Sequence, residues 1–87
     1  MKVKDGFVLR AFAGSNIVVP VGAATAQFNG MITLNDSGAF LWRELEKGAD
    51  VDSLTEALLR EYDVDEATAR ACAADFIAKL EEAGCLE

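Results

Sequence analysis

The sequence predicts an α+β domain in which a three-stranded antiparallel sheet is followed by three helices. Two observations indicate this. Up to Leu34 the hydrophobic residues follow the two-residue period of strands, and from Asn35 they recur at helical spacings of three and four. Elements segregated in this way pack as a layer of helices on a sheet. The 87 residues have room for one core, so we expect residues 1–87 to form a single domain.

Three runs in the first third are expected to be strands. Residues 7–13 alternate in side-chain character, and residues 14–16 (Gly-Ser-Asn) supply a turn into a second, β-branched run over residues 17–21. Pro20 has no N–H to donate to a sheet, so it should lie at the end of its strand or at a bulge. A third run covers residues 28–34. Together they predict a hairpin extended by a third strand.

Capping residues and glycines divide the rest of the chain into three helices. Short polar side chains favour the position before a helix, and glycine favours the position after it. The expected N-caps are Asn35 or Asp36, Asp50 and Asp65, and the expected stops are Gly48 and, for the third helix, about Gly84.

Charge is divided unevenly along the chain. The net charge is −7, with a balance of +2 over residues 1–35 and −9 over residues 36–87. Proteins that bind nucleic acid gain affinity by neutralising phosphates with Lys and Arg, so an acidic helical half disfavours that class of partner. No apolar run is long enough to span a bilayer and no signal peptide is visible, so we expect a cytoplasmic protein without a membrane partner.

The residues that usually carry enzyme chemistry are missing. The sequence has no histidine, Cys-x-x-Cys pair, P-loop or Gly-x-Ser-x-Gly motif. Neighbouring acids such as Asp63 and Asp65 flank a helix N-terminus, where carboxylates complement the dipole. We therefore expect no catalytic residue, no metal and no cofactor.

The third helix is expected to pack one apolar stripe on the core. At about 100° per residue, that stripe consists of Ala69, Cys72, Ala73, Phe76 and Leu80. Cys72 would therefore pack in the core, whereas Cys85, near the C-terminus, would be exposed. The two are too far apart along the helix for an intramolecular disulfide.

Two surfaces are candidates for binding. On the third helix, Ala67, Ala71, Ala74 and Ala78 lie opposite the apolar stripe, with Ile77 beside them as an apolar contact point; alternatively, these alanines are simply good helix formers. The third strand, at the sheet edge, has no charged residue to block pairing with another chain. It could accept a peptide strand or a second copy of the chain. A hairpin turn at Asn29 and Gly30 would shorten it.

The chain resembles the PqqD-like family, named for the peptide chaperone of pyrroloquinoline quinone biosynthesis. The similarity rests on residues 30–42 (GMITLNDSGAFLW), residues 54–59, Tyr62-Asp63-Val64 and residues 80–86. It implies a winged helix-turn-helix-like arrangement and recognition of the leader segment of a ribosomally made precursor peptide. It also implies a free-standing, non-catalytic module that presents this peptide to a modifying enzyme, often a radical SAM enzyme.

The resemblance also implies a binding groove between the third strand and the third helix, in which the peptide is added as a strand. The peptide-binding residues that it implies are Phe28, Asn29, Gly30, Met31, Ile32, Thr33 and Leu34 on the strand and Arg70, Ala74, Ile77, Ala78 and Glu81 on the helix. Neither flank of the helix is fixed as the groove wall by spacing alone.

Two other functions remain open. A winged-helix DNA-binding or regulatory protein shares the architecture, but its recognition helix should be basic, whereas the third helix here carries four acids and two bases. A homodimeric structural subunit whose edge strands pair with each other is the other alternative.

Overall fold

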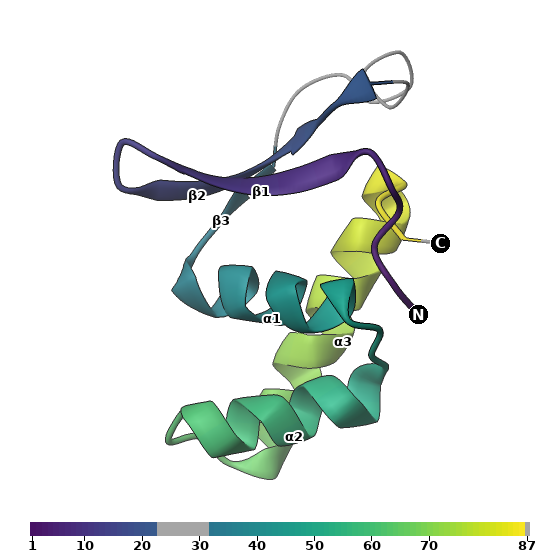
Figure 1. The fold of residues 1–87 in the computed structure, drawn as a ribbon. Coiled ribbons are helices and arrows are strands. Elements are labelled where there is room, and N and C mark those ends of the chain that lie inside the picture. The colour runs from purple at the N-terminus through teal and green to yellow at the C-terminus, as the bar shows by residue number, and fades with distance from the viewer. Residues whose placement is uncertain (23–31, 87) are drawn as a thin grey trace.

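The computed structural model describes residues 1–22 and 32–86, and its element order confirms the predicted fold class (Figure 1). Three strands precede three helices. The elements are β1 (Phe7–Phe12), β2 (Ser15–Pro20), β3 (Ile32–Leu34), α1 (Asp36–Glu46), α2 (Val51–Glu61) and α3 (Glu66–Ala83). The sheet forms one layer, α1 lies beneath it, and α3 runs from α2 back up to the sheet (Figure 1).

The sheet is antiparallel with the strand order β1-β2-β3. Phe12 pairs with Ser15, so the hairpin loop has only two residues, Ala13 and Gly14, with φ of 53° and 79°. Two-residue hairpins favour turns with positive φ because these match the twist of the strands. The expected turn at residues 14–16 is therefore wrong by one to two residues. Pro20 ends β2, as predicted.

β3 is a short edge strand. It pairs with β2 through Ile32 opposite Val18 and Leu34 opposite Asn16, and no other described strand pairs with it. The expected strand began at Phe28, but residues 28–31 lie outside the described residues. The described part thus confirms an edge strand at the predicted end of the sheet.

Each helix begins at a predicted capping residue. The side-chain oxygens of Asn35, Asp50 and Asp65 accept backbone N–H groups three residues on, at 2.8, 2.8 and 2.7 Å. Asn35 rather than Asp36 caps α1. Gly38 permits this tight first turn, because a Cβ there would lie 3.1 Å from Oδ1 of Asn35.

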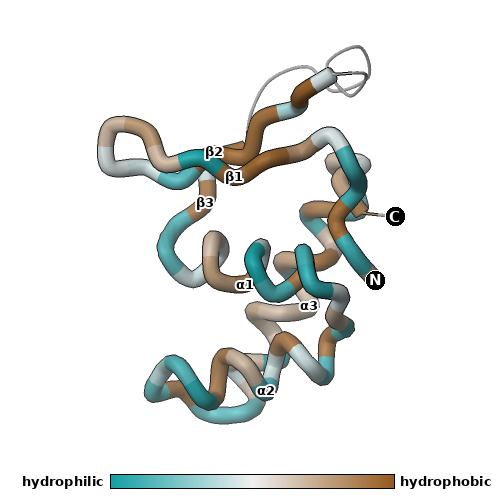
Figure 2. Tube along the Cα trace, in the orientation of Figure 1, coloured by the Kyte–Doolittle hydropathy of each residue, from teal (hydrophilic) through white to brown (hydrophobic). Residues whose placement is uncertain are grey.

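The core joins the inner face of the sheet to all three helices. Figure 2 shows hydrophobic stretches along β1 and β2 above the helices. Val18, Trp42, Leu45, Leu54 and Leu80 are almost completely buried and belong to one cluster. Burying apolar surface of this kind is the main favourable term in folding.

The N-terminal segment is hydrogen-bonded to the residues that follow α1 and to those that follow α3. The Met1 carbonyl accepts the Ala49 N–H at 2.8 Å, and Lys4 N–H donates to the Cys85 carbonyl at 2.7 Å. Val3 is buried and forms a bridge with Leu86. The two termini therefore lie close together (Figure 1).

The predictions for the two cysteines are wrong: Cys72 is exposed and Cys85 is buried. Gly84 follows α3 with φ of 79°, and Cys85 N–H donates back to the Leu80 carbonyl at 2.9 Å. This is a Schellman motif, which turns the residue after the glycine back against the helix. Burial raises the pKa of the Cys85 thiol.

The buried stripe of α3 is rotated from the predicted one. Its members are Ala69, Ala73, Phe76, Ile77 and Leu80. The stripe is centred near Ala73, so at about 100° per residue Cys72 falls outside one edge of it and Ile77 falls inside the other.

Candidate functional site

A groove separates β3 from the C-terminal half of α3. This strand–helix groove has a cavity of about 250 Å³. Its lining residues are Ile32, Thr33, Leu34 and Asn35 on one side and Phe76, Lys79, Leu80 and Ala83 on the other. It adjoins the sheet edge that lacks a neighbouring described strand. An extended chain entering it would find backbone groups on one wall and side chains on the other.

The strand wall of the groove comes from the predicted segment. Ile32, Thr33 and Leu34 all line the cavity, while the other four predicted residues of this wall, Phe28–Met31, lie outside the described residues. Thr33 is exposed, whereas Leu34 is buried in the core. Leu34 thus packs β3 against the core, while Thr33 of the same strand faces solvent.

The helix wall comes from a different flank than the one predicted. Four residues of α3 line the groove: Leu80, in the middle of the buried stripe, and Phe76, Lys79 and Ala83, which lie to one side of it. Together with Cys72 these last three form one stripe, which we name the groove flank. The predicted wall residues Arg70, Ala74, Ala78 and Glu81 are exposed and lie about half a turn away. We name these four the outer flank.

Ile77, the apolar contact point expected on the helix, is 4% exposed and belongs to the core. Its side chain therefore packs in the core and is not available for contact with a ligand. Of the predicted helix residues, none lines the strand–helix groove.

The outer flank contacts α2 instead. Arg70 donates to Asp52 at 2.7 Å, and this hydrogen bond raises the pKa of the Arg70 guanidinium. Both side chains remain at least half exposed, so the pair contributes little to stability. Through Arg70 the outer flank contacts α2, and it does not line the strand–helix groove.

Sequence reasoning missed Lys79 and Ala83 as groove residues. Lys79 lies on a flank that also carries the charged residues Asp75 and Glu82. A lysine stem is apolar, however, and can line a groove while its ammonium stays in water. Lys79 places a positive charge beside the sheet edge of a chain whose net charge is −7.

The described residues contain no cluster of metal-ligating side chains. Among the three helices, none is long and apolar enough to cross a membrane. The groove offers hydrogen-bonding backbone, apolar side chains and one cation, which together suit a peptide better than a small reactive substrate.

A protein-family model for coenzyme PQQ synthesis protein D (PqqD) matches residues 16–86. The chain belongs to the PqqD family. The match begins within β2 and covers β3 and all three helices of this PqqD-family chain, including both walls of the strand–helix groove. A search of curated proteins found no significant match.

Two solved structures share the fold of this PqqD-family chain. One is TbiB1 in complex with the TbiA(beta) leader peptide, with a TM-score of 0.78 and 24% identity over 100% of this chain and 95% of the other. The second is lasso peptide synthetase B1 complexed with the leader peptide, with a TM-score of 0.75 and 19% identity over 97% and 93%. At these identities the similarity establishes the fold.

Proposed function

We propose that this chain is a non-catalytic module that binds the leader segment of a ribosomally made precursor peptide. The peptide adds a strand to β3 and occupies the strand–helix groove. The single observation that carries the proposal is the edge of β3 that no described strand covers, which faces a groove with an apolar and cationic helix wall. Family membership and two leader-peptide complexes of the same fold support it.

In strand addition the two walls of the groove would contribute different interactions: β3 would supply backbone hydrogen bonds and α3 would supply side-chain contacts. Backbone hydrogen bonds to β3 provide affinity that depends little on peptide sequence. Alternate side chains of the added strand point towards α3, where Phe76 offers apolar contact and Lys79 can pair with a carboxylate or a carbonyl oxygen. The predicted residues Phe28–Met31 would extend the pairing edge.

Binding without chemistry implies a second partner that modifies the peptide. We propose that this partner is a modifying enzyme acting on the presented peptide, with a radical SAM enzyme as the class that the family resemblance implies. We propose a cytoplasmic setting for this exchange, where the precursor is made.

The test is a titration of isotopically labelled protein with the leader portion of the precursor peptide encoded nearest its gene, following backbone amide shifts. We expect micromolar binding with the largest shifts at Ile32–Leu34 and along the groove flank. Shifts concentrated on the outer flank would instead restore the helix wall predicted from sequence. A peptide of the same composition in scrambled order is the control.

Two other outcomes would contradict the proposal. Shifts caused by duplex DNA but by no leader peptide would indicate a winged-helix regulator, a function opposed by the four acids on α3. A stable dimer in light scattering that ignores added peptide would indicate that β3 edges pair with each other.

A further inference from the structure

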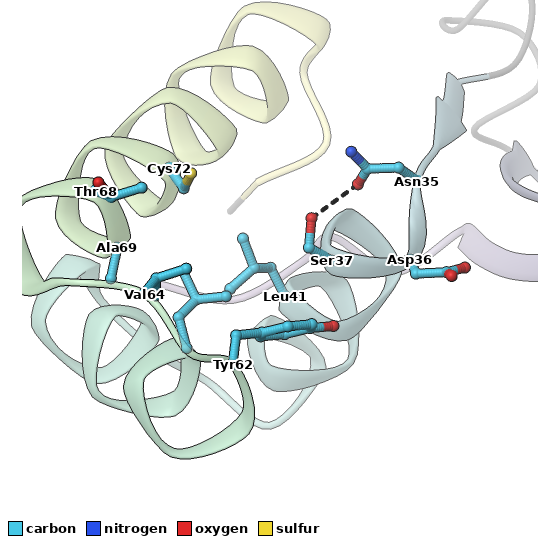
Figure 3. A pocket seen from close by; sticks show the side chains of 10 residues that line it. Asn35, Asp36, Ser37, Leu41, Tyr62, Val64, Thr68, Ala69 and Cys72 are labelled. Atoms are coloured by element: carbon cyan, nitrogen blue, oxygen red, sulfur yellow. Dashed lines mark hydrogen bonds between the residues drawn. The ribbon is translucent and has the colours of Figure 1, made fainter.

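A second and larger cavity lies where the ends of the helices meet. It has a volume of about 480 Å³, and we name it the corner pocket. Figure 3 shows the side chains around it: they come from the start of α1, the end of α2 with the segment after it, and the first half of α3. Asn35 lines both this pocket and the strand–helix groove. The two cavities are therefore neighbours along one path.

The interior of the corner pocket is apolar. Leu41, Leu58 and Ala69 line it and are each less than 5% exposed, and Tyr62 and Val64 stand at its mouth with 37% and 38% exposure. Exposed apolar side chains beside an apolar cavity mark a surface that gains from being covered.

Several polar groups at the rim, on Asn35, Asp36 and Ser37, already have hydrogen-bond partners. Oδ1 of Asn35 accepts Gly38 N–H at 2.8 Å and the Ser37 hydroxyl at 3.0 Å, and Asp36 accepts from Asn16 at 3.3 Å. The Asp36 carboxylate disfavours an acidic group nearby. An uncharged apolar group is therefore the occupant that this pocket fits.

An aromatic contact supports the mouth of the pocket. The Tyr62 ring packs edge-on against Phe40 with ring centroids 5.8 Å apart and planes at 80°. Edge-to-face pairs of this kind are a preferred arrangement of aromatic rings and favour this orientation of Tyr62. A volume of about 480 Å³ falls within the range of preformed small-ligand pockets and holds one large side chain with part of its backbone.

Helix geometry gives the spacing between the two cavities. On α3 the corner pocket is lined by Thr68, Ala69 and Cys72, and the strand–helix groove is lined by Phe76, Lys79, Leu80 and Ala83. These positions are 4 to 15 residues apart, or roughly 6–23 Å at the helical rise. An extended peptide advances about 3.3 Å per residue, so it covers this distance in about two to seven residues.

We propose that the corner pocket is a second subsite for the same precursor peptide. It takes one aromatic or branched apolar side chain, located about two to seven residues beyond the segment paired with β3, on the side that passes Asn35. This inference rests on the peptide-binding function proposed above. It adds a specificity determinant, since strand pairing alone reads little of the sequence.

Cys72 provides a direct reporter of occupancy. Its thiol is exposed and lines the corner pocket, whereas Cys85 is buried and serves as an internal reference. The first experiment measures the rate of Cys72 alkylation by iodoacetamide with and without the leader portion of the precursor peptide encoded nearest the gene. We expect saturating peptide to slow Cys72 alkylation by about tenfold or more, because a buried thiol is shielded from the reagent.

Alanine variants of that peptide locate the anchoring residue without changing the protein. Replacing the one apolar residue that occupies the pocket should weaken binding by roughly ten- to a hundredfold, the usual effect of exposing a large apolar side chain. Protection of Cys72 should be lost with it, while amide shifts at Ile32–Leu34 persist at higher peptide concentrations.

Substitutions in the protein test whether the corner pocket binds the peptide side chain. Cys72→Trp fills the pocket from an exposed helix position and should weaken binding about tenfold or more. Ala71→Trp is the matched control, because Ala71 is also exposed but lines neither cavity, and it should bind as the parent protein does. Circular dichroism checks that both variants keep their helices.

The failures of the two proposals are distinguishable. If the peptide shifts the amides of β3 but leaves Cys72 alkylation and Cys72→Trp binding unchanged, the subsite is overturned and the peptide-binding function stands. If Cys72 is protected without shifts in β3, the pocket binds its ligand independently and the proposed path is wrong. If the peptide causes neither effect, both proposals fail.

Discussion

The two flanks of α3 differ in what faces them rather than in how polar they are. The groove flank carries Lys79 and Cys72 and faces β3 and the ends of α1 and α2 across two cavities. The outer flank carries Ala74 and Ala78, lines neither of these cavities and holds the Arg70 ion pair to α2.

This difference shows why a binding surface cannot be identified from side-chain polarity alone. A ligand gains from a concave site because it is covered on several sides, and a single helix face offers only one. Alanine on an exposed helix flank needs no ligand, since it is a good helix former that leaves little apolar surface uncovered.

The largest effect is expected at the border of the outer flank. Ile77→Ala should lower the free energy of unfolding by about 2–4 kcal/mol, because it leaves a cavity in the core. Chemical denaturation measures this loss. Ala78→Ser, at the neighbouring exposed position, should change stability by no more than about 0.5 kcal/mol. If Ile77→Ala kept full stability but lost peptide affinity, Ile77 would belong to a binding surface.

The second effect contrasts the two thiols. Ellman's reagent should modify Cys72 of the folded protein rapidly. Cys85 should react at least roughly a hundredfold more slowly, because it is buried and reacts only when the C-terminal turn opens. Absorbance on mixing should therefore report one thiol per chain.

Denaturant should release the second thiol. Cys72→Ser is the control that removes the fast phase and leaves the slow one. A fast phase that survives this substitution would mean that Cys85 is accessible and that the Schellman turn does not hold the C-terminal segment against α3.

Much of the fold could be predicted because its signals are local. Asn35, Asp50 and Asp65 mark helix starts, since a short side chain can satisfy the free N–H groups there. The change from a period of two to one of three and four separated the sheet from the helices. The position of the edge strand followed from the chain order.

The helix wall of the site could not be predicted because it depends on how α3 is rotated against the sheet. Alanines occur all around α3, so the sequence marks the edges of the buried stripe only weakly, and the stripe packs into one core cluster with Leu34, Trp42 and other residues distant in sequence. Cys85 had a readable signal that was overlooked: Gly84 followed by an apolar residue is the sequence pattern of a Schellman motif.

A smaller effect should separate the two basic residues of α3. Lys79→Ala should weaken leader-peptide binding about fivefold, because the lysine stem covers the peptide and its ammonium pairs with peptide oxygens. Arg70→Ala removes a cation from the outer flank and should leave the dissociation constant within about twofold. Isothermal titration with the same peptide compares them. Equal losses would indicate that only net charge matters, and a loss confined to Arg70→Ala would place the peptide on the outer flank.

The smallest effect concerns the end of α3 at which both flanks begin. Hydrogen bonds from Thr68 lower the pKa of Asp65, and hydrogen bonds from Ser53 lower that of Asp50. A carboxyl group with a lowered pKa in the folded state stabilises the fold above its unfolded value of about 3.9, and this contribution is lost as the pH falls through the folded value. Thermal unfolding should therefore show a stability that is flat above about pH 5 and declines below about pH 4.

Asp65→Asn separates the charge of the cap from its geometry. Asparagine caps helices about as well as aspartate but does not titrate in this range, so the variant should fold normally and show a shallower acid decline. Asp63→Asn, which removes a nearby carboxylate that is not the cap, is the matched control and should keep the parent profile. An unchanged profile in Asp65→Asn would mean that the N-terminus of α3 gains nothing from the ionised cap. The corner pocket, whose wall includes Thr68 and Ala69 in the first turn of α3, would then depend on packing alone for its shape.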